Sequence, residues 1–299
     1  MEKKPNPFID WEALRSAFMP PMPPVQPMPG KGPGGRAGAP GVPVGPTGPD
    51  PARFADMYNI MAEMEREYTY NQVNCIDVEP GDTVLDIGCG PGRVSCAMAE
   101  RAKSVTALDI NQSCLDYCLN NAKERGLDNV STVLMDWNDV DPGVNVGRHD
   151  IVIASRNPAM FDVRKLNDLA SKYAVIIGWA NAPCIPPIIE ELFKDTEPER
   201  DRPAFPMFRQ DRRLSYNINW NIVYDMGAEP NIRNVKDGFT KTFDNEDEAV
   251  SWLRRIRAFE DEYIPVFKKN LEPYMTKNAD GSVTFRRETR SFVLWWKTI

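Results

Sequence analysis

The chain has 299 residues, of which 42% are hydrophobic and 26% charged, so it can bury a large core as one elaborated domain. Its net charge of −7 argues against a protein whose whole surface grips phosphate backbones, so nucleic acid is not the expected partner. The sequence has no run of about 18 apolar residues and no apolar core of a signal peptide, which predicts a cytoplasmic chain without a membrane partner.

The first part of the chain has the composition of a mobile tail. Residues 1–50 contain 13 of the 27 prolines and 8 of the 19 glycines. Because such a segment cannot build a packed core, we expect a disordered tail over 1–49, with a short helix at 8–18, followed by one domain over 50–299.

The segment 51–71 has apolar residues at three- and four-residue spacing, which predicts a helix. Asp50 can cap this helix, and Pro51 suits its first turn. We interpret 50–80 as a helical cover, which packs on the core or lies over a ligand pocket with Tyr70 near its end.

From residue 83 the chain alternates between short apolar strands and helices. Five such units in succession predict a parallel, doubly wound α/β sheet, which binds ligands at the carboxyl ends of its strands. The expected strands are 83–87, 104–109, 130–135, 149–155 and 173–180, and the expected helices are 91–102, 111–125, 162–172 and 185–193.

The remainder is less regular. We expect a lid at 194–215, where Arg209, Arg212 and Arg213 accompany two phenylalanines, and a further insertion over 226–288. Alternating side chains predict strands at 216–224 and 289–298, and residues 245–267 have helical composition.

A glycine-rich turn follows the first of these strands. Gly88, Gly90 and Gly92 lie at alternate positions, where they let the backbone bend tightly and approach a ligand. Asp86 precedes them, and Asp109 ends the next strand, where doubly wound sheets place a carboxylate against ribose hydroxyls. The sequence therefore predicts a ligand that contains adenosine.

A nicotinamide-dependent dehydrogenase also uses a glycine turn followed by an acid. The spacing disfavours this alternative, because position 93 is arginine where the dehydrogenase fingerprint has its third glycine. Asp86 at the end of the strand also suits an ammonium group better than a pyrophosphate.

The stretch Val84–Gly92 resembles the first motif of the class I S-adenosylmethionine-dependent methyltransferases, and the resemblance extends over about residues 65–180. It implies S-adenosylmethionine as cofactor and a seven-stranded, mostly parallel, Rossmann-like sheet whose last strand is antiparallel. The strands at 216–224 and 289–298 would complete that sheet. The resemblance implies cofactor contacts for Asp86, Gly88, Cys89, Gly90, Gly92, Asp109, Ile110, Asp136, Trp137 and Ser155.

The same resemblance implies a role for each polar contact. Asp86 would face the methionine ammonium group through water or backbone, and Asp109 would accept hydrogen bonds from both ribose hydroxyls. Ser155 would lie beside the sulfonium, opposite the methyl acceptor. The adenine is expected at Asp136, Trp137 and Ile110.

The sequence says less about the methyl acceptor. The exit from the fourth strand, Ser155-Arg-Asn-Pro, departs from the Asn-Pro-Pro-Tyr pattern of methyltransferases that act on amino groups of bases. Candidate substrate contacts are Arg156, Asn157 and Tyr70. No metal site is expected, since the six cysteines lack zinc spacing and His149 is the only histidine.

We therefore expect an S-adenosylmethionine-dependent methyltransferase that acts on a small molecule. Methylation of RNA or protein through local arginines is one alternative. A protein that binds the cofactor without turning it over, or that recruits a partner through its proline-rich tail, is the other.

Overall fold

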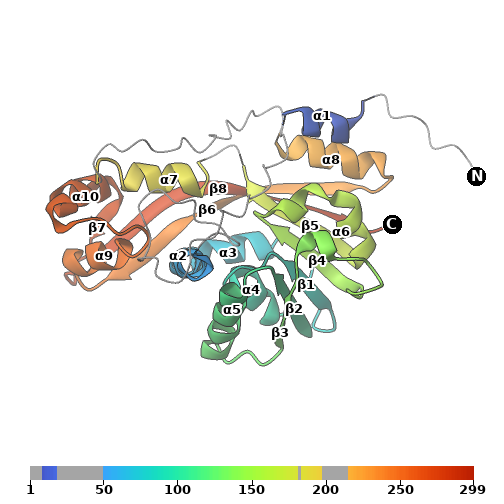
Figure 1. The fold of residues 1–299 in the computed structure, drawn as a ribbon, viewed down its shortest axis with the longest axis horizontal. Helices are drawn as coiled ribbons and strands as arrows, with labels where there is room; N and C mark the ends of the chain where they lie inside the picture. The colour runs from blue at the N-terminus through green and yellow to red at the C-terminus, as the bar shows by residue number, and fades with distance from the viewer. Residues whose placement is uncertain (1–8, 19–49, 181–182, 197–214) are drawn as a thin grey trace, which may run out of the picture.

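The computed structural model describes residues 9–18, 50–180, 183–196 and 215–299. These residues form an eight-stranded sheet of order β3-β2-β1-β4-β5-β8-β6, in which β7 pairs with β8 (Figure 1). The first five strands are parallel, and β8 runs antiparallel to both of its long neighbours. The strands are β1 (Thr83–Ile87), β2 (Ser104–Asp109), β3 (Val130–Leu134), β4 (His149–Ser155), β5 (Ala170–Trp179), β6 (Pro230–Phe243), β7 (Met275–Lys277) and β8 (Val283–Lys297).

Side-chain caps set the starts of several helices. Asp50 accepts a hydrogen bond from the Arg53 amide at 3.0 Å, and Asn111 accepts one from the Ser113 amide at 2.9 Å. The helices are α1 (Trp11–Phe18), α2 (Pro51–Met64), α3 (Arg66–Val73), α4 (Arg93–Ala99), α5 (Gln112–Glu124), α6 (Val163–Leu169), α7 (Ile185–Leu192), α8 (Tyr216–Asp225), α9 (Glu246–Leu253) and α10 (Ile264–Leu271), with short 3₁₀ turns η1 (Trp137–Asp139), η2 (Pro158–Phe161), η4 (Asp261–Tyr263) and η5 (Glu272–Tyr274).

Helices cover both faces of the sheet. Successive side chains of a strand point to opposite faces, and on β4 Ile153 packs with α3 and α4 while Val152 packs with α6 and α8. The parallel strands are therefore apolar on both sides, as buried parallel strands are. This is the doubly wound α/β fold expected from the sequence, with its last strand antiparallel.

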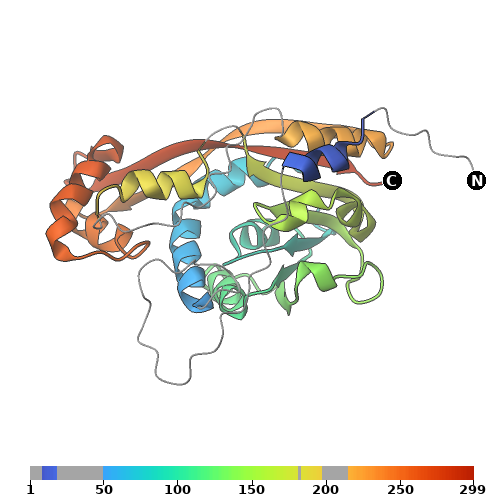
Figure 2. The ribbon, with the colours of Figure 1, turned by 45° about the horizontal axis from the view of Figure 1, so that its top comes forward.

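The long hairpin of β6 and β8 extends beyond the sheet and carries a second lobe (Figure 2). Its outer half packs with α2, α7, α9 and α10 around a separate core that includes Phe239, Phe267 and Phe285. Figure 1 shows α2 between this lobe and α5, so the cover helix bridges the two parts of the molecule.

One predicted strand is a helix instead. Residues 216–224 alternate in polarity, yet they form α8 and bury Ile218, Ile222 and Val223 along one side. Apolar residues four apart suit a helix as well as a strand, and packing against the sheet selects the helix here. The sixth strand of the sheet is β6, which the sequence analysis had included in an insertion.

Two further helix predictions need correction. The helix expected over 245–267 is interrupted: α9 ends at Leu253, and α10 begins afresh with Pro265 in its first turn, the position in which a helix tolerates proline. The helix expected over 51–71 is divided at Glu65 into α2 and α3.

The short helix expected at 8–18 is present as α1, which lies along α8 in both views (Figures 1 and 2). Trp11 packs against the core beneath, and Arg15 donates a hydrogen bond to Asn219 at 3.1 Å. The rest of the expected tail and nearly all of the expected lid lie outside the described residues.

All six cysteines are free thiols. Among the described helices none combines the length and the apolar character needed to cross a bilayer.

Deleting residues 1–18 should lower the melting temperature more than deleting residues 1–8. The longer deletion removes the packing of Trp11 and the Arg15 hydrogen bond, an expected loss of about 1–2 kcal/mol or roughly 2–6 °C. Thermal unfolding followed by circular dichroism measures both variants. Equal melting temperatures would show that α1 does not stabilise the fold.

Candidate functional site

The glycine turn between β1 and α4 has three glycines with positive φ, of +60° at Gly88, +54° at Gly90 and +83° at Gly92. A side chain at Gly88 would collide with Asn157, and one at Gly92 would collide with Cys118. At Gly90 nothing lies within 4 Å of the corresponding position. Two of the glycines are thus required by packing, and Gly90 alone leaves open space for a ligand to approach the backbone.

Asp86, near the end of β1, is almost fully buried. Ser95 donates a hydrogen bond to its Oδ2 at 2.6 Å, whereas its Oδ1 has no partner among the described residues. Burial raises the pKa of Asp86 to about 6, against the opposing effect of the Ser95 hydrogen bond. A buried, unpaired carboxylate oxygen is costly unless a ligand supplies a donor.

Asp109 ends β2 and is oriented by the backbone of the glycine turn. Its Oδ2 accepts from the Gly90 amide at 2.8 Å, and its Oδ1 accepts from the Asn111 amide at 2.9 Å. Burial raises the pKa of Asp109 in spite of these bonds. Ile110 beside it leaves 36% of its surface exposed, an apolar face next to a carboxylate.

Asp136 and Trp137 follow β3 along the same edge of the sheet. Asp136 caps η1 by accepting from the Asn138 amide at 2.8 Å. The Lys165 ammonium lies 4.2 Å from the centre of the Trp137 ring and donates to the Trp137 carbonyl at 2.7 Å.

Three predicted site residues take structural roles. Cys89 packs into the small core that includes Cys118, rather than toward the turn's open side. Asn157 donates to the Ile87 carbonyl at 2.6 Å and so shapes the loop after β4. The Tyr70 hydroxyl donates a hydrogen bond to Glu100 at the far end of α4, away from the glycine turn.

Arg156 stands at the centre of a buried ionic network. Its φ is +57°, a conformation that arginine rarely adopts. Its guanidinium donates to Glu65 at 2.9 Å, to Asp237 and, at 3.3 Å, to Ser291, and it stacks 3.7 Å from the centre of the Trp179 ring. Arg156 therefore joins the end of β4 to the cover helices and to the β6–β8 hairpin.

Arg93, the first residue of α4, is the second arginine of this network. It forms an ion pair with Glu65 at 3.0 Å and donates to Gln72 at 2.7 Å, to Thr69 at 3.0 Å and to Ser155 at 2.9 Å. The side chains of both arginines are only 10% exposed. Two cations and two carboxylates are thus enclosed at the carboxyl ends of β1 and β4.

Glu65 and Asp237 are two functional candidates that were not predicted from the sequence. Glu65 interrupts an apolar helical stripe, so an acid on the inward face was a signal that could have been found. Asp237 lies in a polar, glycine-containing stretch without alternation, and nothing local distinguishes it. Both are fully or nearly fully buried.

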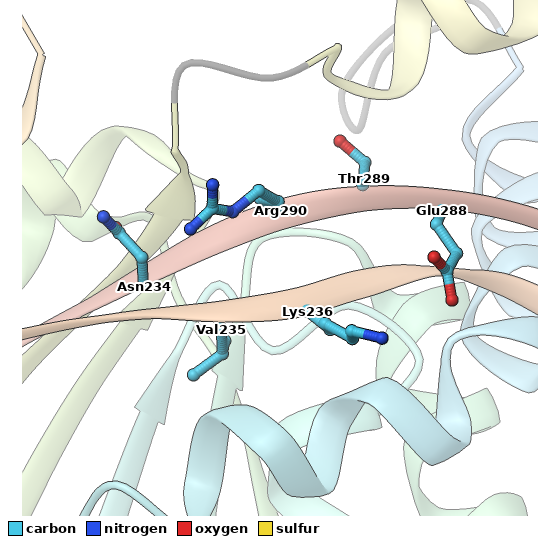
Figure 3. A pocket seen from close by; sticks show the side chains of 6 residues that line it. All are labelled: Asn234, Val235, Lys236, Glu288, Thr289 and Arg290. Carbon is cyan, nitrogen blue, oxygen red and sulfur yellow. The ribbon is translucent and has the colours of Figure 1, made fainter.

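A shallow depression of about 520 Å³ lies on the β6–β8 hairpin beside this network (Figure 3). Asp237 and Ser291, which bind Arg156, directly follow two of its residues along the two strands. Figure 3 shows Val235 and Thr289 pointing to opposite sides of the hairpin. The lining residues are Asn234, Val235, Lys236, Glu288, Thr289 and Arg290.

No three histidine, cysteine, aspartate or glutamate side chains are grouped as metal ligands in the part of the chain that the structure describes.

A family model described as a methyltransferase domain matches residues 84–176, which include the glycine turn, Asp109 and Arg156. Nocamycin O-methyltransferase of Saccharothrix syringae is 33% identical over 42% of this chain and 45% of that protein. A protein of Haemophilus influenzae is 36% identical over 34% of this chain and 37% of its own length. A 23S rRNA uracil C5-methyltransferase of Alkalilimnicola ehrlichii is 33% identical over 26% of this chain and 18% of that protein.

The chain thus spans less than half the length of these curated relatives. Among solved structures, magnesium protoporphyrin IX methyltransferase of Synechocystis, which has bound SAH, superposes with a TM-score of 0.40 at 15% identity, over 81% of this chain and 84% of that chain. Residues 84–176 thus match a methyltransferase domain, and S-adenosylmethionine is the cofactor that such a domain uses.

Proposed function

We propose that this chain transfers the methyl group of S-adenosylmethionine to a small-molecule acceptor. The observation that carries the proposal is the pair of carboxylates beside the glycine turn, above all the buried Oδ1 of Asp86 that has no donor. An ammonium group is the donor that a buried carboxylate binds best, and the methionine end of the cofactor carries one.

The neighbouring residues fit the rest of the cofactor. Asp109 is fixed by two backbone amides, and its carboxylate is suited to accept hydrogen bonds from a ribose diol. Ile110 offers an apolar face for adenine, and the open side of Gly90 lets the ligand contact the protein backbone. Bound S-adenosylmethionine supplies a methyl group already activated by its sulfonium. The chain then has to bind and orient the acceptor and to exclude water. This positioning can accelerate an in-line displacement without a dedicated base.

Two features favour a small acceptor over a nucleic acid. The net charge of −7 opposes long-range attraction of a polyanion. The cover helices α2 and α3 also lie over the carboxyl ends of β1 and β4, where Glu65 contacts Arg93 and Arg156, and such a cover suits an enclosed pocket.

Labelled methyl donor tests the proposal directly. The purified chain is incubated with S-adenosylmethionine carrying a labelled methyl group and with fractions of a cell extract, and the products are analysed by mass spectrometry. We expect label in a small metabolite fraction. Label in RNA or protein would contradict the proposed acceptor class, and cofactor binding without any labelled product would favour a protein that does not turn its ligand over.

Replacing Asp109 by asparagine should weaken S-adenosylmethionine binding by about 1–3 kcal/mol, because a neutral amide replaces a charged acceptor of the ribose hydroxyls. Calorimetric titration measures the affinity. Asp168→Asn, at an exposed position on α6, is the control and should bind as the wild type does. Unchanged affinity in Asp109→Asn would remove this residue from the site.

Cofactor affinity should fall as the pH drops below about 6. The pKa of Asp86 is raised to about 6, so below that pH its carboxyl is protonated and loses its attraction for the ammonium, which stays charged. The expected loss approaches about tenfold per pH unit. Titrations between pH 5 and 8 should show this slope in the wild type and a shallower one in Asp86→Asn, where only the raised pKa of Asp109 contributes. Equal slopes in both proteins would exclude Asp86 as the titrating contact.

A further inference from the structure

The carboxylate of Glu65 lies between two arginines. It is 3.0 Å from Nε of Arg93 and 2.9 Å from Nη1 of Arg156. Building on the proposed function, we propose that Arg93 and Arg156 form a binding site for a carboxylate group of the methyl acceptor, and that Glu65 occupies this site until the acceptor displaces it.

The arginines are held in place without Glu65. Asp237 and Ser291 bind Nη2 of Arg156, and the Trp179 ring supports its guanidinium plane. Arg93 has its own partners, which are Thr69, Gln72 and Ser155. Loss of the Glu65 contact would therefore leave two oriented cations with one neighbouring carboxylate, and this preorganised arrangement favours an incoming anion.

Glu65 fills the site incompletely. Both of its oxygens contact the single Nη1 of Arg156, while Nε of the same guanidinium is buried and has no partner among the described residues. A carboxylate bound to an arginine commonly uses two parallel N–H donors. A ligand carboxylate that engages Nε as well as Nη1 would make the hydrogen bond that Glu65 leaves unmade.

Glu65 also lies where the cover is interrupted. It occupies the break between α2 and α3, with no side-chain cap at the start of α3. Burial raises its pKa in spite of both arginines, so its charged form is held in an unfavourable environment. Moving this side chain disrupts neither helix, because its backbone already lies at their junction.

The arginines are placed where an acceptor is needed. Arg93 follows the glycine turn directly, and Arg156 follows Ser155 at the end of β4, the residue expected beside the sulfonium. The depression of Figure 3 adjoins the network along β6 and β8. Its lining includes the cations Lys236 and Arg290 and the single acid Glu288, so its net charge is positive and favours the approach of an anion.

A pair of probes of equal shape tests the charge requirement. Benzoate and its neutral counterpart benzamide are titrated calorimetrically into the full chain saturated with S-adenosylhomocysteine. The proteins compared are the wild type, Glu65→Gln, Arg156→Lys and the control Glu63→Gln, which changes an exposed acid of α2 that pairs with Lys241. Affinity of each protein for S-adenosylhomocysteine is measured first, and melting temperatures report folding.

We expect Glu65→Gln to bind benzoate at least about fivefold more tightly than the wild type, because the competing charge is gone while a hydrogen-bonding side chain remains. Benzamide binding should not change, Glu63→Gln should match the wild type, and Arg156→Lys should bind benzoate more weakly. If Glu65→Gln does not fold, Glu65→Asp, whose shorter side chain reaches the arginines less well, should show the same direction.

Unchanged or weaker benzoate binding in the folded Glu65 variant would overturn the proposal. Tighter binding of S-adenosylhomocysteine in Glu65→Gln, with benzoate unchanged, would also overturn it by assigning the arginine pair to the cofactor. Failure of the wild type to bind S-adenosylmethionine or S-adenosylhomocysteine would contradict the proposed function instead, and the benzoate comparison without cofactor would still test the carboxylate site.

Discussion

The buried pairing of Arg93 and Arg156 with Glu65 and Asp237 is the constraint on which the rest of the site depends. Each member belongs to a different part of the chain: the start of α4, the end of β4, the break in the cover helices and the β6–β8 hairpin. Because charges removed from water must be paired, none of these parts can be displaced without leaving an uncompensated ion, unless another charge takes its place. The network therefore fixes the cover and the hairpin relative to the glycine turn.

The two sides of the site are unequal in their electrostatics. Arg93 and Arg156 are paired with carboxylates, whereas Asp86 and Asp109 accept hydrogen bonds only from neutral groups. Burial raises the pKa of both acids. A cationic ligand at the glycine turn would relieve this imbalance, and an anionic one would increase it. The same small region thus prefers a positive group at one end and a negative group at the other, as the proposed donor and acceptor require.

Much of the fold and of the cofactor side could be predicted because the signals are local. The strand, the glycines and Asp109 occur in one continuous stretch, and apolar strands alternate with helices at regular spacing. The errors arose where long-range packing decides. The polar strand β6 is held by β8 and α3, the alternating stretch at 216–224 is helical because the sheet packs against it, and Asp237 gains its role only from partners distant in sequence. Cys89 lies within the motif and Tyr70 on the cover helix α3, yet both side chains point away from the open side of the turn.

The position of β8 has a consequence for the synthesis of the chain. The strand β8 lies between β5 and β6, so β5 keeps an open, apolar edge until β8 has been synthesised. β6 is made earlier but has no sheet to join before β8 arrives, and the pairing of β8 with β5 closes a loop of more than a hundred residues. The parallel part of the sheet can assemble before β8 is made, whereas the β6–β8 hairpin can form only afterwards. The network that includes Asp237 and Ser291 is therefore completed only when β8 has paired.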